Sequence, residues 1–202
     1  MTDPRTSPPT TGDLLRRLEE YVAEARAAGA PIADACCLST ATPDGRPSAR
    51  MLIFKGVDDG RVTFATNYGS RKGEELERNP RAALTFWWPQ TDRQVRIEGR
   101  VVRLHAAGSD AIHAARPRGS QISIWASDQS RPVANREVLR RRRDVVEQRV
   151  DGIDALPRPV RGGGSARSPG VVEVWEARDE RVQLRARFDG AGAAWTVSGL
   201  PP

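Results

Sequence analysis

Residues 35–67 read ACCLSTATPDGRPSARMLIFKGVDDGRVTFATN, and this stretch decides the fold. Three apolar, strand-like segments are separated by two turn signals, Pro43-Asp44-Gly45 and Asp58-Asp59-Gly60. The order strand, turn, strand, turn, strand predicts a meander of antiparallel strands.

The residues that follow the meander continue the β pattern. Residues 69–82 (GSRKGEELERNPRA) predict a short helix that Gly69-Ser70 opens and Pro80 stops. Residues 82–89 (AALTFWWP) and 93–104 (RQVRIEGRVVRL) predict two further strands, with Gly99 as a bend or bulge. Five strands around short helices favour a mainly β protein of the α+β class, in which a small antiparallel barrel carries peripheral helices.

Helices are predicted on both sides of these strands. In the N-terminal part, apolar residues recur at helical spacing, namely Leu14, Leu15, Leu18, Val22 and Ala25. Asp13 is available as the N-cap of this helix, and Gly29 is placed to end it. Residues 106–150 read as mainly helical and loop.

The two ends of the chain differ in composition from the middle. Residues 1–11 are rich in Pro, Thr and Ser and predict a disordered tail, which leaves residues 12–202 as one domain. Residues 157–170 (PRPVRGGGSARSPG) predict a flexible loop because Pro, Gly and Ser dominate them. Closing strands are predicted at VVEVWEA (171–177), RVQLRARF (181–188) and AWTV (194–197).

Composition argues against a membrane protein and a nucleic-acid-binding protein. No run approaches the roughly 18 apolar residues of a membrane helix, and no apolar signal segment begins the chain, so a cytoplasmic protein is expected. The net charge is +6, but the 32 basic residues are mostly interleaved with 26 acidic ones. The run Arg140–Arg143 lies in a helical stretch with an apolar side and is interpreted as a solvated helix face.

Common catalytic motifs are absent from the sequence. It contains no GxxxxGK[ST], GxGxxG, HExxH or GxSxG motif. The two histidines, His105 and His113, have no acidic cluster near them, so neither a metal site nor a histidine triad is predicted. Cys36 and Cys37 are adjacent in an apolar stretch and are interpreted as two buried thiols, since a disulfide between neighbours would be strained.

Cationic and hydroxyl groups gather where strands end and a helix begins. Arg50 and Lys55 share one strand, and Thr66, Ser70, Arg71 and Lys72 surround the turn into the helix at 69–82. Free N–H groups at a helix N-terminus, a Ser hydroxyl and two cations favour a phosphate dianion. From these residues alone, a solvated helix turn with incidental basic residues is an equally open interpretation.

Five blocks of sequence resemble one known family in both order and spacing. They are RMLIFK (50–55), ATNYGSRKGEELERNPRAALTFWW (65–88), RQVRIEGRVVRL (93–104), RPRGSQISIWASDQS (116–130) and EVWEARDERVQLRARF (173–188). Together they are similar to the signature blocks of the pyridoxine/pyridoxamine 5′-phosphate oxidases. The resemblance implies an FMN-binding split β-barrel, Greek-key-like and antiparallel, that forms a homodimer with FMN in clefts at the subunit interface.

The resemblance also implies which residues bind FMN. Arg50, Arg71 and Lys72 would meet the phosphate, with Ser70 nearby. The full set of implied cofactor-binding residues is Arg50, Met51, Lys55, Ala65, Thr66, Ser70, Arg71, Lys72, Gln94, Gln129, Ser130, Trp175 and Arg185. Without the resemblance, Trp175 reads as a core aromatic residue and Gln94 as part of a polar strand face.

The substrate side departs from the family pattern. The resemblance implies a substrate phosphate pocket at Lys55, Arg116 and Ser120, but the family's tyrosine position is Ile112 here. An Arg-x-His pair would face the substrate ring as the catalytic pair, and this chain has Arg181 and Gln183, so the imidazole is missing. The loop RGGGSARSPG (161–170) lacks the Trp of the family's Trp-Gly-Gly turn. These changes spare the FMN side.

Three functions are consistent with this pattern. Lys55, Arg116, Ser120 and Arg181 favour an oxidase of pyridoxine or pyridoxamine 5′-phosphate, which passes hydride to flavin N5 and then electrons to O₂, giving H₂O₂. Ile112, Gln183 and the altered loop favour a flavin oxidase of another small molecule, as in phenazine biosynthesis. A third hypothesis is a non-catalytic flavin- or heme-binding module, since loss of a ring-facing His is one way in which a site loses activity.

Overall fold

The computed structural model describes residues 9–177, 185–192 and 194–201. Its strands are β1 (Ala35–Ala41), β2 (Pro47–Asp58), β3 (Arg61–Asn67), β4 (Arg81–Trp88), β5 (Arg93–Arg103), β6 (Gly162–Glu176), β7 (Arg185–Ala191) and β8 (Ala194–Leu200). Its helices are α1 (Thr11–Ala27), α2 (Arg71–Arg78), α3 (Ala106–Ala114), α4 (Arg118–Ala126) and α5 (Arg136–Arg149), with a 3₁₀ turn η1 (Pro89–Thr91).

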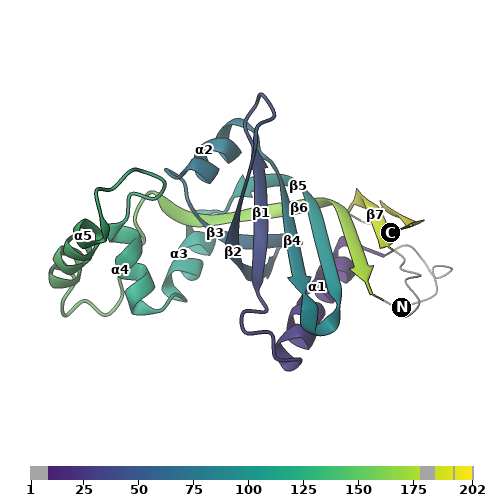
Figure 1. The fold of residues 1–202 in the computed structure, drawn as a ribbon, viewed down its shortest axis with the longest axis horizontal. Coiled ribbons are helices and arrows are strands. Elements are labelled where there is room, and N and C mark those ends of the chain that lie inside the picture. Colours follow the sequence, from purple (N-terminus) through teal and green to yellow (C-terminus); the bar gives the residue numbers. More distant parts are fainter. Residues whose placement is uncertain (1–8, 178–184, 193, 202) are drawn as a thin grey trace.

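The strands form an antiparallel barrel with a two-strand extension (Figure 1). The sheet order is β3-β2-β1-β4-β5-β6-β7-β8, and an additional pairing of β3 with β6 closes the described strands β1–β6 into a barrel. β1, β2 and β3 form the predicted meander, and β4 returns to lie beside β1, which is the Greek-key order. The predicted fold class is confirmed.

Strand β6 corrects the prediction of a flexible loop at 157–170. Residues 162–167 pair with β3, residues 171–175 pair with β7, and β5 runs along almost the whole strand. The predicted irregularity at Gly99 is confirmed, because the β5–β6 register shifts between Glu98 and Gly99, and a Cβ on Gly99 would lie 2.1 Å from the Ser168 carbonyl oxygen. Glycine and proline are used here for close strand packing.

Helix α1 contributes its apolar face to the core. Leu15, Leu18 and Val22 pack in one cluster with barrel residues such as Phe64 and Phe86. The helix begins at Thr11, within the segment predicted as a tail, because Thr10 is its N-cap; Asp13, predicted as the cap, instead completes a capping box with Thr10. Gly29 follows the end of the helix with φ +87°, as predicted.

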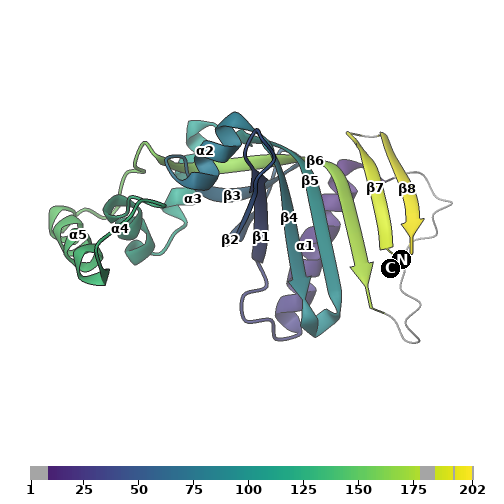
Figure 2. The same ribbon diagram turned by 45° about the horizontal axis from the view of Figure 1, so that its top comes forward.

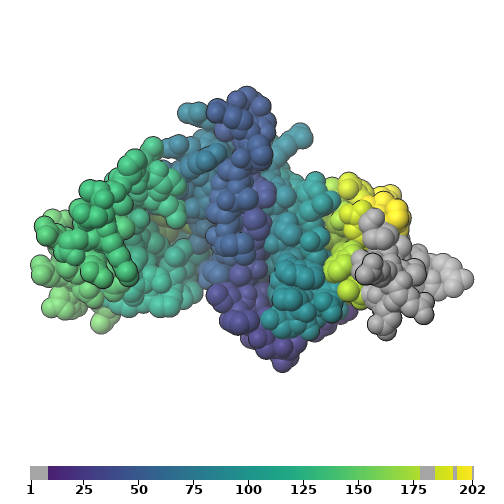
Figure 3. Space-filling view, viewed as in Figure 1, coloured from purple at the N-terminus to yellow at the C-terminus, as the bar shows by residue number. Residues whose placement is uncertain are grey.

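Helices α3, α4 and α5 lie on one side of the barrel, and β7 and β8 lie on the other (Figures 1, 2 and 3). Every residue of α5 is described, and none is buried; Arg140–Arg143 are exposed, as the sequence predicts. Both thiols are free, with Cys36 buried as expected and Cys37 only half-buried. None of the helices in the described part of the chain is long and apolar enough to cross a membrane.

One charged residue lies inside the barrel. Arg167 of β6 is directly opposite Val62 of β3 and Val101 of β5, both core residues, so its side chain points into the interior. It is 0% exposed, and its three guanidinium nitrogens have no hydrogen-bond partner within the described residues. Burial of an unpaired charge opposes folding.

We predict that Arg167→Met raises the free energy of unfolding by about 1–3 kcal/mol, because it removes an uncompensated buried charge and keeps most of the side-chain length. Urea denaturation measures the change. Arg100→Met is the matched control on β5, where the side chain is exposed, and its effect should stay within about 0.5 kcal/mol. A less stable Arg167→Met protein would mean that the buried guanidinium contributes favourably.

Candidate functional site

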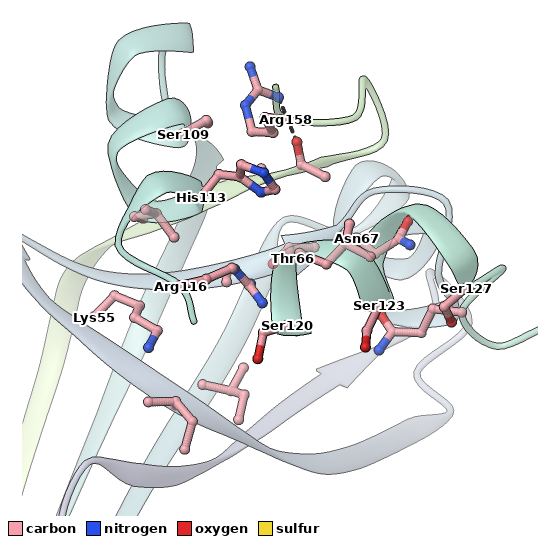
Figure 4. A pocket seen from close by; sticks show the side chains of 18 of the residues that line it. Lys55, Thr66, Asn67, Ser109, His113, Arg116, Ser120, Ser123, Ser127 and Arg158 are labelled. Atoms are coloured by element: carbon pink, nitrogen blue, oxygen red, sulfur yellow. Dashed lines mark hydrogen bonds between the residues drawn. The ribbon is translucent and has the colours of Figure 1, made fainter. Parts of the chain in front are cut away.

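A cavity of about 550 Å³ lies between the barrel and the helices α3 and α4 (Figure 4). Its walls come from β2, β3, the start of α2, α3, α4 and the start of β6. This volume is in the range of cofactor sites. It brings together ten of the residues predicted for the site: Arg50, Met51, Lys55, Ala65, Thr66, Lys72, Ile112, Arg116, Ser120 and Gln129.

Arg50 is held in place by a buried carboxylate behind it. Its Nη1 donates to the Thr40 hydroxyl (2.7 Å) and the Leu38 carbonyl (3.1 Å), and its Nη2 donates to the Ser48 hydroxyl (2.6 Å). The same Nη2 lies 3.3 Å from Glu75 Oε2. Glu75 comes from α2, whereas Thr40 and Ser48 come from β1 and β2, so the network fixes the helix to the sheet.

Glu75 stays ionised although it is only 5% exposed. Burial alone would raise its pKa, but hydrogen bonds from Ser48, Thr40 and Arg71 outweigh that effect and lower the pKa to about 2. The carboxylate therefore stays negative at neutral pH, and it orients Arg50 without lining the cavity itself.

The N-terminus of α2 supplies the second cation. Ser70 is the N-cap, and its hydroxyl accepts from the Gly73 amide. Lys72 Nζ donates to Ser70 Oγ (3.2 Å) and to Gln129 Oε1 (2.7 Å). Gly73 is required here, because a Cβ would lie 2.3 Å from the Tyr68 carbonyl oxygen. The predicted convergence of Ser70, Lys72 and Gln129 is present.

Positive charge accumulates at this cavity. Burial, together with the nearby charges of Arg50 and Arg116, lowers the pKa of Lys72 to about 8. We call Arg50, Lys72 and Arg116 the cationic cluster. None of the described residues that line the cavity is acidic. The Thr66 hydroxyl is buried beside the cluster and lacks a hydrogen-bond partner among the described residues. This arrangement fits an anionic ligand that also accepts hydrogen bonds.

Other predicted residues lie elsewhere. Arg71 is largely exposed and pairs with Glu75, so it does not line the cavity. Ser130 follows Gln129 in a left-handed conformation with φ +68° and is also outside the lining. Arg181 and Gln183, the predicted catalytic pair, lie outside the described residues.

Gln94, Trp175 and Arg185 form a second group, which we call the β5–β7 row. Gln94 of β5 is paired with Trp175 of β6, and Trp175 is paired with Arg185 of β7. Gly163 on the same strand β6 lines the cavity. The strand from Gly163 to Trp175 spans roughly 40 Å at about 3.3 Å per residue. Within one chain, the cavity and the row are therefore two separate groups.

Two titratable residues of the cavity were not predicted as site residues from the sequence. His113 of α3 and Arg158 before β6 both line the cavity, on the same side as Arg116 (Figure 4). Helical spacing from Ser109 to Ile112, His113 and Arg116 could have revealed the first. Arg158 belongs to a segment interpreted as a flexible loop, so no periodic pattern pointed to it.

Two of the departures from the family pattern, Ile112 and the glycine-rich segment at the start of β6, lie next to each other. A Cβ on Gly164 would lie 2.8 Å from Ile112 Cδ1 and 2.4 Å from Leu104 Cδ1. The Gly164 amide also donates to the Ser109 hydroxyl of α3 (3.1 Å). The glycines of β6 therefore let α3 pack directly on the strand, and Ile112 fills part of that contact.

The sequence of this chain is similar to those of several known proteins. A pyridoxine/pyridoxamine 5′-phosphate oxidase of Rubrobacter xylanophilus is 44% identical over 190 residues, covering 94% of this chain and 87% of that protein. One of Cupriavidus pinatubonensis is 42% identical over 192 residues, covering 95% and 90%.

Solved structures share the fold. PhzG from Burkholderia lata, in complex with tetrahydrophenazine-1-carboxylic acid, is similar with a TM-score of 0.89 and 32% identity, covering 100% of this chain and 97% of that one. A pyridoxamine 5′-phosphate oxidase-related, FMN-binding protein from Nostoc punctiforme has a TM-score of 0.73 at 18% identity, covering 90% and 95%. The family model described as pyridoxamine 5′-phosphate oxidase matches residues 23–149. The chain belongs to the pyridoxamine 5′-phosphate oxidase family.

Proposed function

We propose that the protein is an FMN-dependent oxidase of a small anionic ring compound. The observation that carries the proposal is the cationic cluster beside the N-terminus of α2, in a cavity whose described lining contains no acidic residue. Arg50, Lys72 and the helix N-terminus would hold the FMN phosphate. When bound, FMN supplies the redox chemistry, taking a hydride from a substrate carbon and passing the electrons to O₂, which gives H₂O₂.

The rest of the cavity fits the other parts of FMN. The unpartnered Thr66 hydroxyl and the polar groups of Lys55 and Gln129 offer hydrogen bonds to the ribityl chain and the flavin ring. Leu52 and Ile53 supply apolar lining. Arg71 and Ser130 remain proposed contacts, although neither lines the cavity of the single chain.

We also propose that two copies of the chain complete each site. The β5–β7 row of Gln94, Trp175 and Arg185 lies far along β6 from the cavity, although the family resemblance assigns all of them to one cofactor. In a homodimer, the β5–β7 row of one subunit would face the cavity of the other. Both groups could then contact the same cofactor although they are far apart within one chain. The family resemblance assigns Arg181 and Gln183, which lie outside the described residues, to the substrate side of the same site.

Two substrate classes are supported by different observations. The relatives named pyridoxine/pyridoxamine 5′-phosphate oxidase, together with Lys55, Arg116 and Ser120 in the cavity, favour a phosphorylated pyridine. Ile112 in place of a tyrosine, and the Burkholderia lata protein that holds a reduced ring carboxylic acid, favour a reduced ring compound. The first is the main proposal, and the second is the alternative.

Lys72 provides a direct test of the phosphate assignment. We predict that Lys72→Met weakens FMN binding by about 1.5–3 kcal/mol, the contribution of one charge-assisted hydrogen bond. In the wild type, affinity should be level from pH 7 to about 8 and fall at higher pH, because free Lys72, with its pKa of about 8, then loses the proton that binds the phosphate.

Fluorescence titration of FMN measures both effects. The pH-dependent fall near 8 should disappear in Lys72→Met. Arg46→Met is the matched control, because Arg46 is exposed and pairs with Asp44 in the β1–β2 turn. Unchanged FMN affinity in Lys72→Met would refute the phosphate assignment.

Turnover tests the proposed reaction. Protein saturated with FMN should produce H₂O₂ in air with pyridoxine 5′-phosphate or pyridoxamine 5′-phosphate, and the aldehyde product absorbs in the near ultraviolet. Turnover of a reduced ring carboxylate in place of both phosphates would establish the alternative. If no donor of either class reduces the flavin under anaerobic conditions, the protein is not an oxidase of these compounds.

A further inference from the structure

His113 is a buried imidazole with one nitrogen lacking a partner. It lies on α3, is 4% exposed and lines the cavity (Figure 4). The ring hydrogen-bonds the backbone of Leu156, whereas Nε2 has no partner among the described residues. We assign the ring proton to Nδ1 and the free lone pair to Nε2, because the hydrogen bond to the Leu156 backbone raises the pKa of His113 and so involves a donor on the ring. A buried polar atom without a partner costs about 1–3 kcal/mol unless a ligand satisfies it.

Arg158 stands next to His113 and is fixed in position (Figure 4). Its Nε donates to Asp110 Oδ1 (2.7 Å), and its Nη1 donates to the Gly162 carbonyl (2.5 Å). These bonds use two of the five N–H donors of a guanidinium. The side chain is 17% exposed, so the charge is largely enclosed at the cavity wall.

Burial and the neighbouring positive charges favour the neutral form of His113 in the free protein. Burial lowers the pKa of His113, and so do the positive charges of Arg116 and Arg158. The Leu156 hydrogen bond and the charge of Asp110 act in the opposite direction but do not reverse the shift. An anion bound between the two arginines would offset their charge and allow His113 to take up a proton on Nε2.

We propose that His113 and Arg158 bind the anionic group of the substrate, a phosphate monoester or a carboxylate, and determine which substrates the cavity accepts. This inference rests on the proposed function, since it concerns the substrate end of the same cavity. The ligand oxyanion lies between Arg158 and Arg116 and receives a hydrogen bond from Nε2–H. His113 thereby replaces the polar group that is missing at the neighbouring Ile112.

If His113 binds the anionic group, the affinity for the substrate should depend on pH. Binding raises the pKa of His113 above its value in the free protein, so binding takes up a proton in the pH range between the two values. Ligand affinity therefore falls as the pH rises through that range. Exchanging the imidazole for a group that does not titrate removes this dependence.

The test uses the fact that the chain has only two histidines. ¹⁵N-detected imidazole spectra of the protein, recorded with and without FMN, are followed during titration with pyridoxal 5′-phosphate and, separately, with phenazine-1-carboxylate. His105→Asn assigns the two signals, because His105 only caps α3 through the Gly108 amide and Asn keeps that hydrogen bond.

The expected result is that one of the two ligands converts His113 to the protonated form at pH 7 and leaves His105 unchanged. The ligand that does so identifies phosphate or carboxylate as the anion recognised. Unchanged His113 signals, while absorbance shows that the ligand is bound, would overturn the proposal. So would the failure of both ligands to bind at millimolar concentration.

Variants separate this inference from the proposed function. His113→Phe and Arg158→Gln should each raise the Kd of the recognised ligand about 10-fold, while the Kd of FMN stays within about twofold of the wild type. Arg161→Gln is the control, because Arg161 is nearby in sequence but pairs with Asp128 and does not line the cavity. If the wild-type protein does not bind FMN, the proposed function is wrong. The response of His113 to the two ligands in the absence of FMN would then still test whether His113 binds the anion.

Discussion

Repulsion among three enclosed cations is the constraint on which the rest of the site depends. Arg50, Lys72 and Arg116 are close enough that the two arginines help to lower the pKa of Lys72, and no described residue lining the cavity is acidic. Among the described residues, the carboxylate that pairs with the cluster is Glu75, which lies behind Arg50 and also accepts hydrogen bonds from Thr40, Ser48 and Arg71. The fold therefore holds Arg50 rigidly but leaves the positive charge facing the cavity uncompensated, and a bound anion relieves that cost.

The barrel explains how such a cluster can be held. The meander places Arg50 on β2 beside the β1 hydroxyl that fixes it, and α2 adds Lys72 and Glu75, which lie three residues apart on its buried face. Strand β6 then links two groups of residues. Its first half closes the barrel on β3 and forms part of the cavity wall, and its second half carries Trp175 into the extension made by β7 and β8. A long strand of this kind suits a site shared between subunits, because it presents the two groups at opposite ends of one rigid element.

Much of the fold could be predicted from the sequence, because turn signals and strand periodicity depend on residues that are close together in the chain. The meander, the helix opened by Ser70 and the bulge at Gly99 follow from residues that are neighbours in the chain.

The strand from Gly162 to Pro169 could not be predicted, because its Gly- and Ser-rich composition is typical of loops. It forms a strand because it pairs with β3 and packs against α3, which are both distant in sequence. Likewise, His113 and Arg158 are brought together by the path of the chain over more than 40 residues, which no local pattern encodes. The resemblance predicted cofactor residues but did not show that those described here form two separate groups in one chain.

We propose that this cavity recognises FMN more through its phosphate than through its flavin ring. The most direct measurement compares the affinity of the protein for FMN and for riboflavin, which has the same ring and ribityl chain but no phosphate. With several charge-assisted hydrogen bonds lost, riboflavin should bind at least about 100-fold more weakly than FMN. Equal affinity for the two flavins would contradict the claim that Arg50 and Lys72 bind the FMN phosphate.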